Sequence, residues 1–151
     1  MQRSRVLAGS AVLALAALTS LATTATASAA PAPKGATYNG ACGSGYSVVN
    51  SAEITGKGTV FLTYSGTTGK NCVVTVRAAT GSPVEISTYL GPSDGSSEPV
   101  FDDGLFTSYA GPVYLAAKGR CVDWGGAIEN VSVNVNGTNC GKLAPGIVTH
   151  S

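Results

Sequence analysis

The chain has 151 residues, with nine Lys or Arg against eight Asp or Glu, one histidine and four cysteines. This near-neutral balance, with scattered basic residues, argues against nucleic-acid binding, which needs clustered cations to displace phosphate counterions. The one histidine, His150, lies next to the C-terminus, so a serine or cysteine nucleophile would lack a general base.

The N-terminus has the pattern of an export signal. Arg3 and Arg5 precede an uncharged apolar run over residues 6–21, and the small residues 25–30 follow. The apolar run is shorter than the ~20 residues of a membrane-spanning helix. We therefore predict a signal peptide at residues 1–29, cleaved after Ala29, with Ala27 and Ala30 as alternatives.

Cleavage defines the mature protein and its location. Removing 29 of 151 residues leaves 122, enough for one domain, and without Arg3 and Arg5 seven cations face eight acids, a net charge of −1. No second apolar span or basic amphipathic helix follows. The sequence predicts a secreted protein, extracellular or at the cell surface, with no membrane attachment after signal removal.

The mature chain has β periodicity from residue 38 to residue 141. Residues 30–37, rich in Pro and Ala, are expected to form a flexible leader that buries nothing, and residues 142–151 a C-terminal tail. Alternating apolar and polar residues predict seven short strands, at 46–54, 59–64, 72–77, 85–90, 112–117, 121–128 and 131–136. Residues 91–104, rich in Pro, Ser, Gly and acid, are expected to be an irregular loop. The sequence thus predicts an all-β fold, a small antiparallel β-sandwich or barrel.

Four cysteines in an exported chain predict two disulfides. A zinc site is disfavoured because no CxxC or CxxH pair is present. Of three possible pairings we favour Cys42–Cys72 and Cys121–Cys140, each adding roughly 3–4 kcal/mol. A hairpin centred near Glu129 would bring Cys121 close to Cys140. Cys42 and Cys72 would not be neighbours in a simple meander, so their bridge is expected to join two sheets.

One aromatic group is a candidate ligand site. Sugar rings stack on exposed aromatic faces, so Trp124 with Asp123, together with Tyr109 and Tyr114, could bind a glycan. The competing interpretation, which we favour, is that the single tryptophan beside a cysteine packs in the core.

Acidic residues offer weaker candidates. Asp94, Glu98, Asp102 and Asp103 fall within residues 91–104, where their simplest role is to solvate a loop. A calcium site is an alternative, although the spacing matches no EF-hand. A two-carboxylate hydrolase and a protease-inhibitor loop are further alternatives. We predict no cofactor, metal or catalytic residue.

Five segments together resemble a known family. They are CGSGYSVVNS at 42–51, GKNCVVTVR at 69–77, FTSYAGPVYL at 106–115, RCVDWGG at 120–126 and NCG at 139–141. This set is similar to the small secreted spore-associated proteins of actinobacteria. The resemblance implies an exported protein found with the spore surface, with no enzymatic activity attached to the pattern. Our functional prediction is a secreted, non-enzymatic spore- or cell-surface protein. The alternative is a carbohydrate-binding β-module whose partner is a cell-wall or spore-surface polymer.

Overall fold

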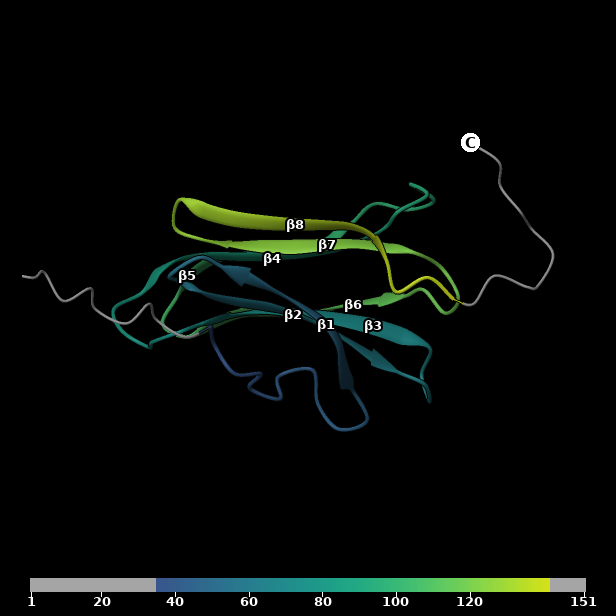
Figure 1. Cartoon of the computed structure of the whole chain (residues 1–151), viewed down its shortest axis with the longest axis horizontal. Coiled ribbons are helices and arrows are strands. Elements are labelled where there is room, and N and C mark those ends of the chain that lie inside the picture. Colours follow the sequence, from purple (N-terminus) through teal and green to yellow (C-terminus); the bar gives the residue numbers. More distant parts are fainter. Residues whose placement is uncertain (1–34, 142–151) are drawn as a thin grey trace, which may run out of the picture. The chain divides into compact units, whose positions relative to one another are not determined.

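The computed structural model describes residues 35–141, which form two antiparallel four-stranded sheets stacked face to face (Figure 1). Sheet A has the strand order β1-β2-β3-β6 and contains β1 (Ser47–Ile54), β2 (Gly58–Ser65), β3 (Lys70–Arg77) and β6 (Tyr109–Ala116). Sheet B has the order β5-β4-β7-β8 and contains β4 (Val84–Pro92), β5 (Val100–Phe106), β7 (Val122–Ile128) and β8 (Val131–Thr138). The predicted all-β sandwich is confirmed. The signal peptide, its cleavage site and the C-terminal tail lie outside the described residues.

The eighth strand, β5, lies where an irregular loop was expected. Residues 91–104 do not form one loop, because β4 extends to Pro92 and pairs with β5 from Val84↔Phe106 to Leu90↔Val100. The pattern of β5 is mixed: Phe101 and Leu105 are exposed, whereas Asp102 and Gly104 are half-buried between the inward-facing Val100 and Phe106. Apolar and polar residues on both faces conceal a strand from any search for hydrophobic alternation.

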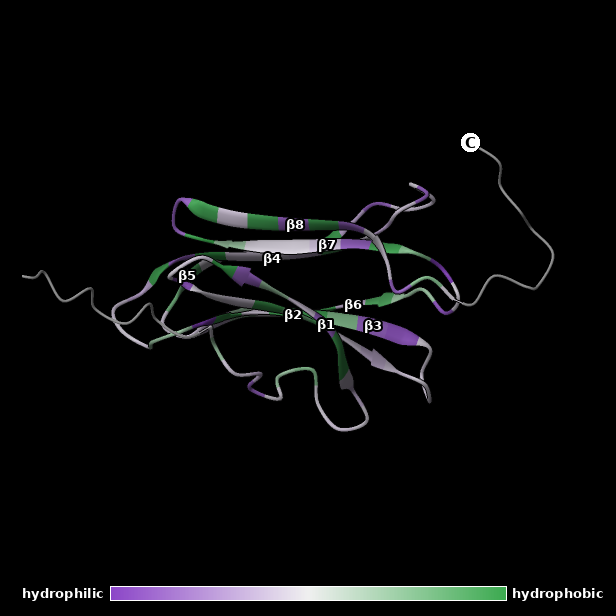
Figure 2. Cartoon of the chain, viewed as in Figure 1, coloured by the Kyte–Doolittle hydropathy of each residue, from purple (hydrophilic) through white to green (hydrophobic). Residues whose placement is uncertain are grey.

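The core lies between the two sheets. Its buried residues come from both inner faces and include Leu62, Val73, Leu90, Trp124 and Ile128. Strand β8 shows the simplest alternation, visible in Figure 2: Val131, Val133 and Val135 pack against this core, and the polar residues between them face outward. Within residues 35–141 no helix is long and apolar enough to cross a bilayer.

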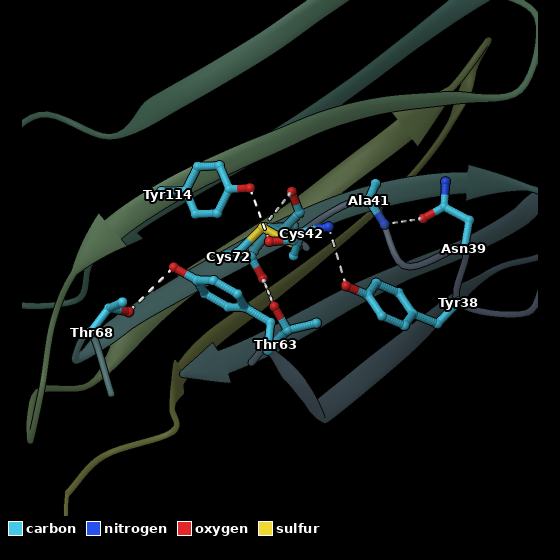
Figure 3. Close-up of a disulfide and its surroundings, with 10 residues drawn as sticks. Tyr38, Asn39, Ala41, Cys42, Thr63, Thr68, Cys72 and Tyr114 are labelled. Atoms are coloured by element: carbon cyan, nitrogen blue, oxygen red, sulfur yellow. Dashed lines mark hydrogen bonds between the residues drawn. A yellow bond between two sulfur atoms is a disulfide. The ribbon is translucent and has the colours of Figure 1, made fainter. Parts of the chain in front are cut away.

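A second apolar cluster lies on the outer face of sheet A. Phe61, Cys72, Val74 and Val76 are buried there although they point away from the core. Residues 35–46, which we call the N-terminal strap, cover them with the side chains of Ala36, Tyr38, Ala41 and Tyr46. Figure 3 shows Tyr38 and Ala41 beside the disulfide. Both faces of β2 and β3 are therefore buried. Ala36, which lies within the predicted leader, packs on this cluster.

Both favoured disulfides are confirmed. Cys42–Cys72 ties the strap to β3 within sheet A, so the expectation that it joins two sheets is wrong. That expectation assumed a simple meander of strands. The strap contains no strand, so its position could not be read from such a meander. Cys121–Cys140 joins the residue before β7 to a residue just after β8, with Cα atoms 4.0 Å apart. It closes the end of this hairpin opposite its turn.

Candidate functional site

The two outer faces of the sandwich differ. The strap lies across sheet A, whereas no described segment lies across sheet B in the same way (Figure 1). On sheet B, Phe101 and Leu105 are 64% and 70% exposed, more than any other large apolar side chain described. We call the outer surface of sheet B the open face; its side chains are Glu85, Ser87, Tyr89, Phe101, Asp103, Leu105, Asp123, Ala127, Ser132 and Asn134.

Two aromatic rings form a shelf on the open face. Strand register places Phe101, Tyr89, Gly125 and Asn134 in one row across sheet B. The rings of Tyr89 and Phe101 have centroids 6.1 Å apart and planes inclined by 32°. A Cβ at Gly125 would lie 2.7 Å from Cε1 of Tyr89 and 3.0 Å from Oδ1 of Asn134, so only glycine lets the Tyr89 ring lie there. Phe101 and Tyr89 are named the aromatic shelf.

The environment of Tyr89 affects its phenol. Partial burial, and secondarily the negative charge of Asp123, raises the pKa of Tyr89 above its ordinary value. The side chain therefore stays neutral at physiological pH and keeps its O–H as a hydrogen-bond donor. The shelf thus combines apolar ring surface with a polar hydroxyl.

A shallow groove runs beside the aromatic shelf. It has a volume of about 280 Å³ and is lined by Glu85, Ser87, Asp103, Leu105, Ala127 and Glu129, among others. Its floor is low because small side chains, Ser87 and Ala127, are paired at its centre. Ligand pockets that enclose a small molecule are typically ~300–1,000 Å³. An open groove of this size suits a segment of a longer chain that continues across the surface.

The charge on sheet B has a single sign. Its four strands contain Glu85, Asp102, Asp103 and Asp123 and no Lys or Arg. Asp102 lies on the inner side and accepts the Gly111 N–H at 2.6 Å. Asp123 accepts hydrogen bonds from the Ser93 hydroxyl and from the Gly137 N–H. Glu85 and Asp103 are exposed, and the salt bridges of the described chain involve neither.

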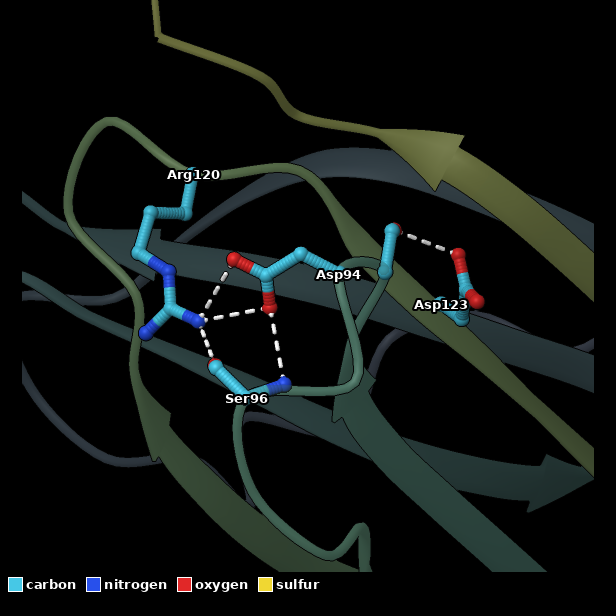
Figure 4. Close-up of polar contacts among 5 residues, drawn as sticks. Asp94, Ser96, Arg120 and Asp123 are labelled. Atoms are coloured by element: carbon cyan, nitrogen blue, oxygen red, sulfur yellow. Dashed lines mark hydrogen bonds and ion pairs between the residues drawn. The ribbon is translucent and has the colours of Figure 1, made fainter.

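The remaining turn between β4 and β5 is held by an ion pair at the end of the open face (Figure 4). Arg120 Nη2 donates to both carboxylate oxygens of Asp94, at 2.8 and 3.0 Å, and also bonds to the Ser96 hydroxyl. The pKa of Asp94 is lowered chiefly by hydrogen bonds from Ser96 and further by Arg120. Asp94 bonds Arg120 and Ser96, whereas Asp102 bonds Gly111, so these two acids do not share a site. Residues 35–141 contain no group of three acidic, histidine or cysteine side chains placed to hold a metal ion.

The four residues predicted as a glycan site do not form one site. Trp124 is 0% exposed and its indole N–H donates to Thr138 Oγ1 at 2.8 Å, so it is a core residue and offers no face to a sugar. Asp123 alone lies on the open face. Tyr109 and Tyr114 lie on β6 in sheet A, and the Tyr114 hydroxyl donates to the Cys42 carbonyl at 3.1 Å (Figure 3).

The aromatic shelf was not predicted as a site. The alternation of β4 already predicts that Tyr89 points outward, because Ile86, Thr88 and Leu90 lie on the inner face of the same strand. Phe101 had no such signal because β5 was not recognised as a strand. Tyr89 and Phe101 are neighbours because of the register between β4 and β5, and local sequence does not predict that register.

These features define a small, disulfide-linked antiparallel β-sandwich with one covered and one open outer face. No family model matches the chain, and no solved structure matches it. The chain is 50% identical over 124 residues, 82% of its own length and 80% of the relative's, to spore-associated protein A of Streptomyces coelicolor. The chain belongs to the spore-associated protein family of actinobacteria.

Proposed function

We propose that this is a secreted, non-enzymatic protein that binds a polysaccharide of the cell wall or spore surface through the open face of sheet B. The observation that carries the proposal is the aromatic shelf. Phe101 of the shelf is 64% exposed, whereas the strap covers the apolar cluster at the centre of the opposite face and the exposed Tyr109 and Tyr114 there are 38% and 39% exposed. Contiguous exposed apolar surface, unlike single exposed residues, is typical of interaction sites, and Phe101 and Tyr89 are direct neighbours on adjacent strands.

The side chains of the open face suit carbohydrate. Exposed ring faces pack against the C–H surfaces of a sugar ring, and the phenol of Tyr89 supplies a polar group at its edge. Asn134 at the end of the same row can both donate and accept hydrogen bonds, as sugar hydroxyls require. The face is open rather than enclosed, which matches a polymer that contacts the protein along several sugar units.

Two features support a location outside the cytoplasm. Both disulfides need an oxidising compartment in which to form and persist. The relative is named for its association with spores. These features agree with the signal peptide predicted at residues 1–29.

The exposure of the acids supports binding rather than hydrolysis. Glu85 and Asp103 are diagonal neighbours on adjacent strands, a relationship that separates side chains by ~7–8 Å. Glycosidase pairs have similar separations, but their general acid is desolvated to keep its proton at neutral pH. Both Glu85 and Asp103 are exposed. The groove is therefore suited to hold a polymer without cleaving it.

A sedimentation assay tests this function. Oxidised, mature protein is mixed with insoluble peptidoglycan, cellulose and chitin, and the bound fraction is compared for wild type, Phe101→Ala and Tyr89→Ala. Tyr109→Ala is the matched control, since Tyr109 is 38% exposed on the other sheet. We expect retention of wild type and Tyr109→Ala and loss in Phe101→Ala and Tyr89→Ala, with circular dichroism showing all four folded. Absence of wild-type retention on every polymer, or equal loss in Tyr109→Ala, would overturn the proposal.

A further inference from the structure

We infer that the open face selects polysaccharide whose sugars carry free, protonated amino groups. This inference rests on the proposed function and adds the chemistry of the ligand. It is based on the charge of the face and on where its acids lie relative to the aromatic shelf.

The negative charge of the open face is only partly balanced by cations of the protein. All four charged residues in the strands of sheet B are acids, and the cations of the described chain are engaged elsewhere or lie on sheet A and in turns. Arg120 bonds Asp94, and Arg77 donates to the backbone carbonyls of Ser82 and Thr107. Lys118 lies between β6 and β7, and Lys70 begins β3 of sheet A.

Two cations do lie near the groove. Lys57 pairs with Glu129, a residue of the groove wall, and the charge of Arg77 also acts on Glu129. With Glu85 and Asp103, the groove and these two cations therefore comprise three carboxylates and two positive charges, a net charge of −1. Charge complementarity favours a cationic ligand here and disfavours phosphate-bearing or carboxylate-bearing polymers.

The position of Asp103 couples this charge to the aromatic shelf. Asp103 is the next outward residue after Phe101 on β5, and Ser87 is the next after Tyr89 on β4. Successive outward residues of a strand are about 7 Å apart. A sugar unit stacked on the shelf thus places its ring substituents near the Asp103 carboxylate. An ammonium substituent would donate a charge-assisted hydrogen bond, stronger than one between neutral groups.

An acetylated amine would make a poorer partner. Its amide is neutral, so Glu85 and Asp103 would receive no opposite charge, and its acetyl group would have to fit against exposed carboxylates. A neutral glucan could stack on the aromatic shelf, but like the acetylated sugar it would carry no positive charge to pair with Glu85 and Asp103. The expected order of affinity is therefore free amino sugar first, with N-acetylated and neutral sugars below it.

Soluble oligosaccharides of equal length test the inference. Binding of oxidised, mature protein is measured by calorimetry with chitosan oligomers and fully acetylated chitin oligomers at a mildly acidic pH. We expect chitosan to bind about tenfold more tightly, the effect of one hydrogen bond between charged groups. Added salt should reduce this preference because exposed charges are screened.

Variants assign the preference to particular acids. Asp103→Asn and Glu85→Gln should each lose most of the preference for chitosan while binding of acetylated oligomers stays unchanged. Glu53→Gln removes an exposed acid from β1 of sheet A and should leave the preference intact. Asp103 and Glu85 are exposed, so these variants should fold, which thermal melts verify.

The outcomes separate the inference from the function beneath it. Equal binding of the two oligomers, or an unchanged preference in both Asp103→Asn and Glu85→Gln, would overturn the inference. If that binding still required Phe101, polysaccharide binding itself would stand. Polylysine bound as tightly as chitosan and without dependence on Phe101 would also overturn the inference, since the face would then attract any polycation. Absence of binding to every saccharide would overturn the proposed function as well.

Discussion

Cys42 and Cys72, whose Cα atoms lie 6.1 Å apart, hold a segment without strands against the outer face of sheet A. Around this bond the strap buries Phe61 and Val74, and the Tyr114 hydroxyl donates to the Cys42 carbonyl (Figure 3). One face of the sandwich becomes a second small core. The outer face of sheet B has no such cover among residues 35–141.

Replacing both Cys42 and Cys72 by alanine should destabilise the protein and release the strap. Loss of this cross-link should lower the free energy of unfolding by roughly 3–4 kcal/mol, measured by urea denaturation. Limited proteolysis should then cut within residues 35–46 under native conditions. The double variant Cys121→Ala/Cys140→Ala is the control, with a similar stability loss but an uncut strap. A strap that stays protected without its disulfide would show that apolar packing alone holds it.

Trp124→Ala should be a folding variant rather than a binding variant. Trp124 is fully buried, and truncation of such a side chain costs about 3–5 kcal/mol. Thr138→Val, which removes only the acceptor of the indole N–H, should cost about 1 kcal/mol. Chemical denaturation followed by circular dichroism measures both. A Trp124→Ala protein of wild-type stability would contradict the placement of this ring in the core.

The parts of the fold that sequence predicted are those in which local pattern and tertiary burial agree. The alternation of Val131, Val133 and Val135 with polar residues matches a strand with one buried face, as observed. Strand β5 failed this test because Phe101 points out and Asp102 points in. The strap failed for another reason: its small residues and tyrosines have no periodicity, and their burial depends on a disulfide and on sheet A.

The candidate site was less predictable than the fold. A lone tryptophan beside an aspartate is a reasonable sugar-binding signal, yet strand alternation sends Asp123 outward and Trp124 inward. The aromatic shelf joins Tyr89 to Phe101, which belong to strands separated by a turn and aligned by register. Such a pair becomes visible only when the register is known.

Gly126→Ala should strongly destabilise the sandwich. A Cβ at this position would lie 2.1 Å from Thr75 Oγ1 and 2.5 Å from the Ser87 carbonyl oxygen, so the two sheets would have to separate locally. Overpacking of this kind costs about 1–3 kcal/mol. Gly66→Ala is the control, since its Cβ would meet no atom within 4 Å, and it should change stability by less than about 0.5 kcal/mol. Equal melting temperatures for the two variants would refute this close approach of the sheets.

The ion pair between Lys57 and Glu129 should contribute stability only above acidic pH. A hydrogen bond from Lys57, and then its charge, lowers the pKa of the Glu129 carboxyl. A lowered folded-state pKa gives stability that is present above the unfolded value and is lost as the pH falls through the folded value. Lys57→Gln should therefore melt slightly below wild type at neutral pH, and the difference should vanish in strong acid. Because both side chains are partly exposed, high salt should also reduce the difference. A difference that grows on acidification would contradict the pairing.

Two adjacent acids of β5 should separate stability from binding. Asp102 accepts the Gly111 N–H and so joins the edge strands β5 and β6 of the two sheets, whereas Asp103 points outward beside the aromatic shelf. Asp102→Ala leaves that half-buried N–H without its acceptor and should cost about 1–3 kcal/mol, measured by urea denaturation. Asp102→Asn keeps an acceptor oxygen and should recover part of the loss. Asp103→Ala should change stability by less than about 0.5 kcal/mol and instead weaken binding of chitosan oligomers. The opposite assignment, with Asp103 needed for stability and Asp102 for binding, would require the register of β5 to be shifted by one residue, because such a shift exchanges the two faces of a strand.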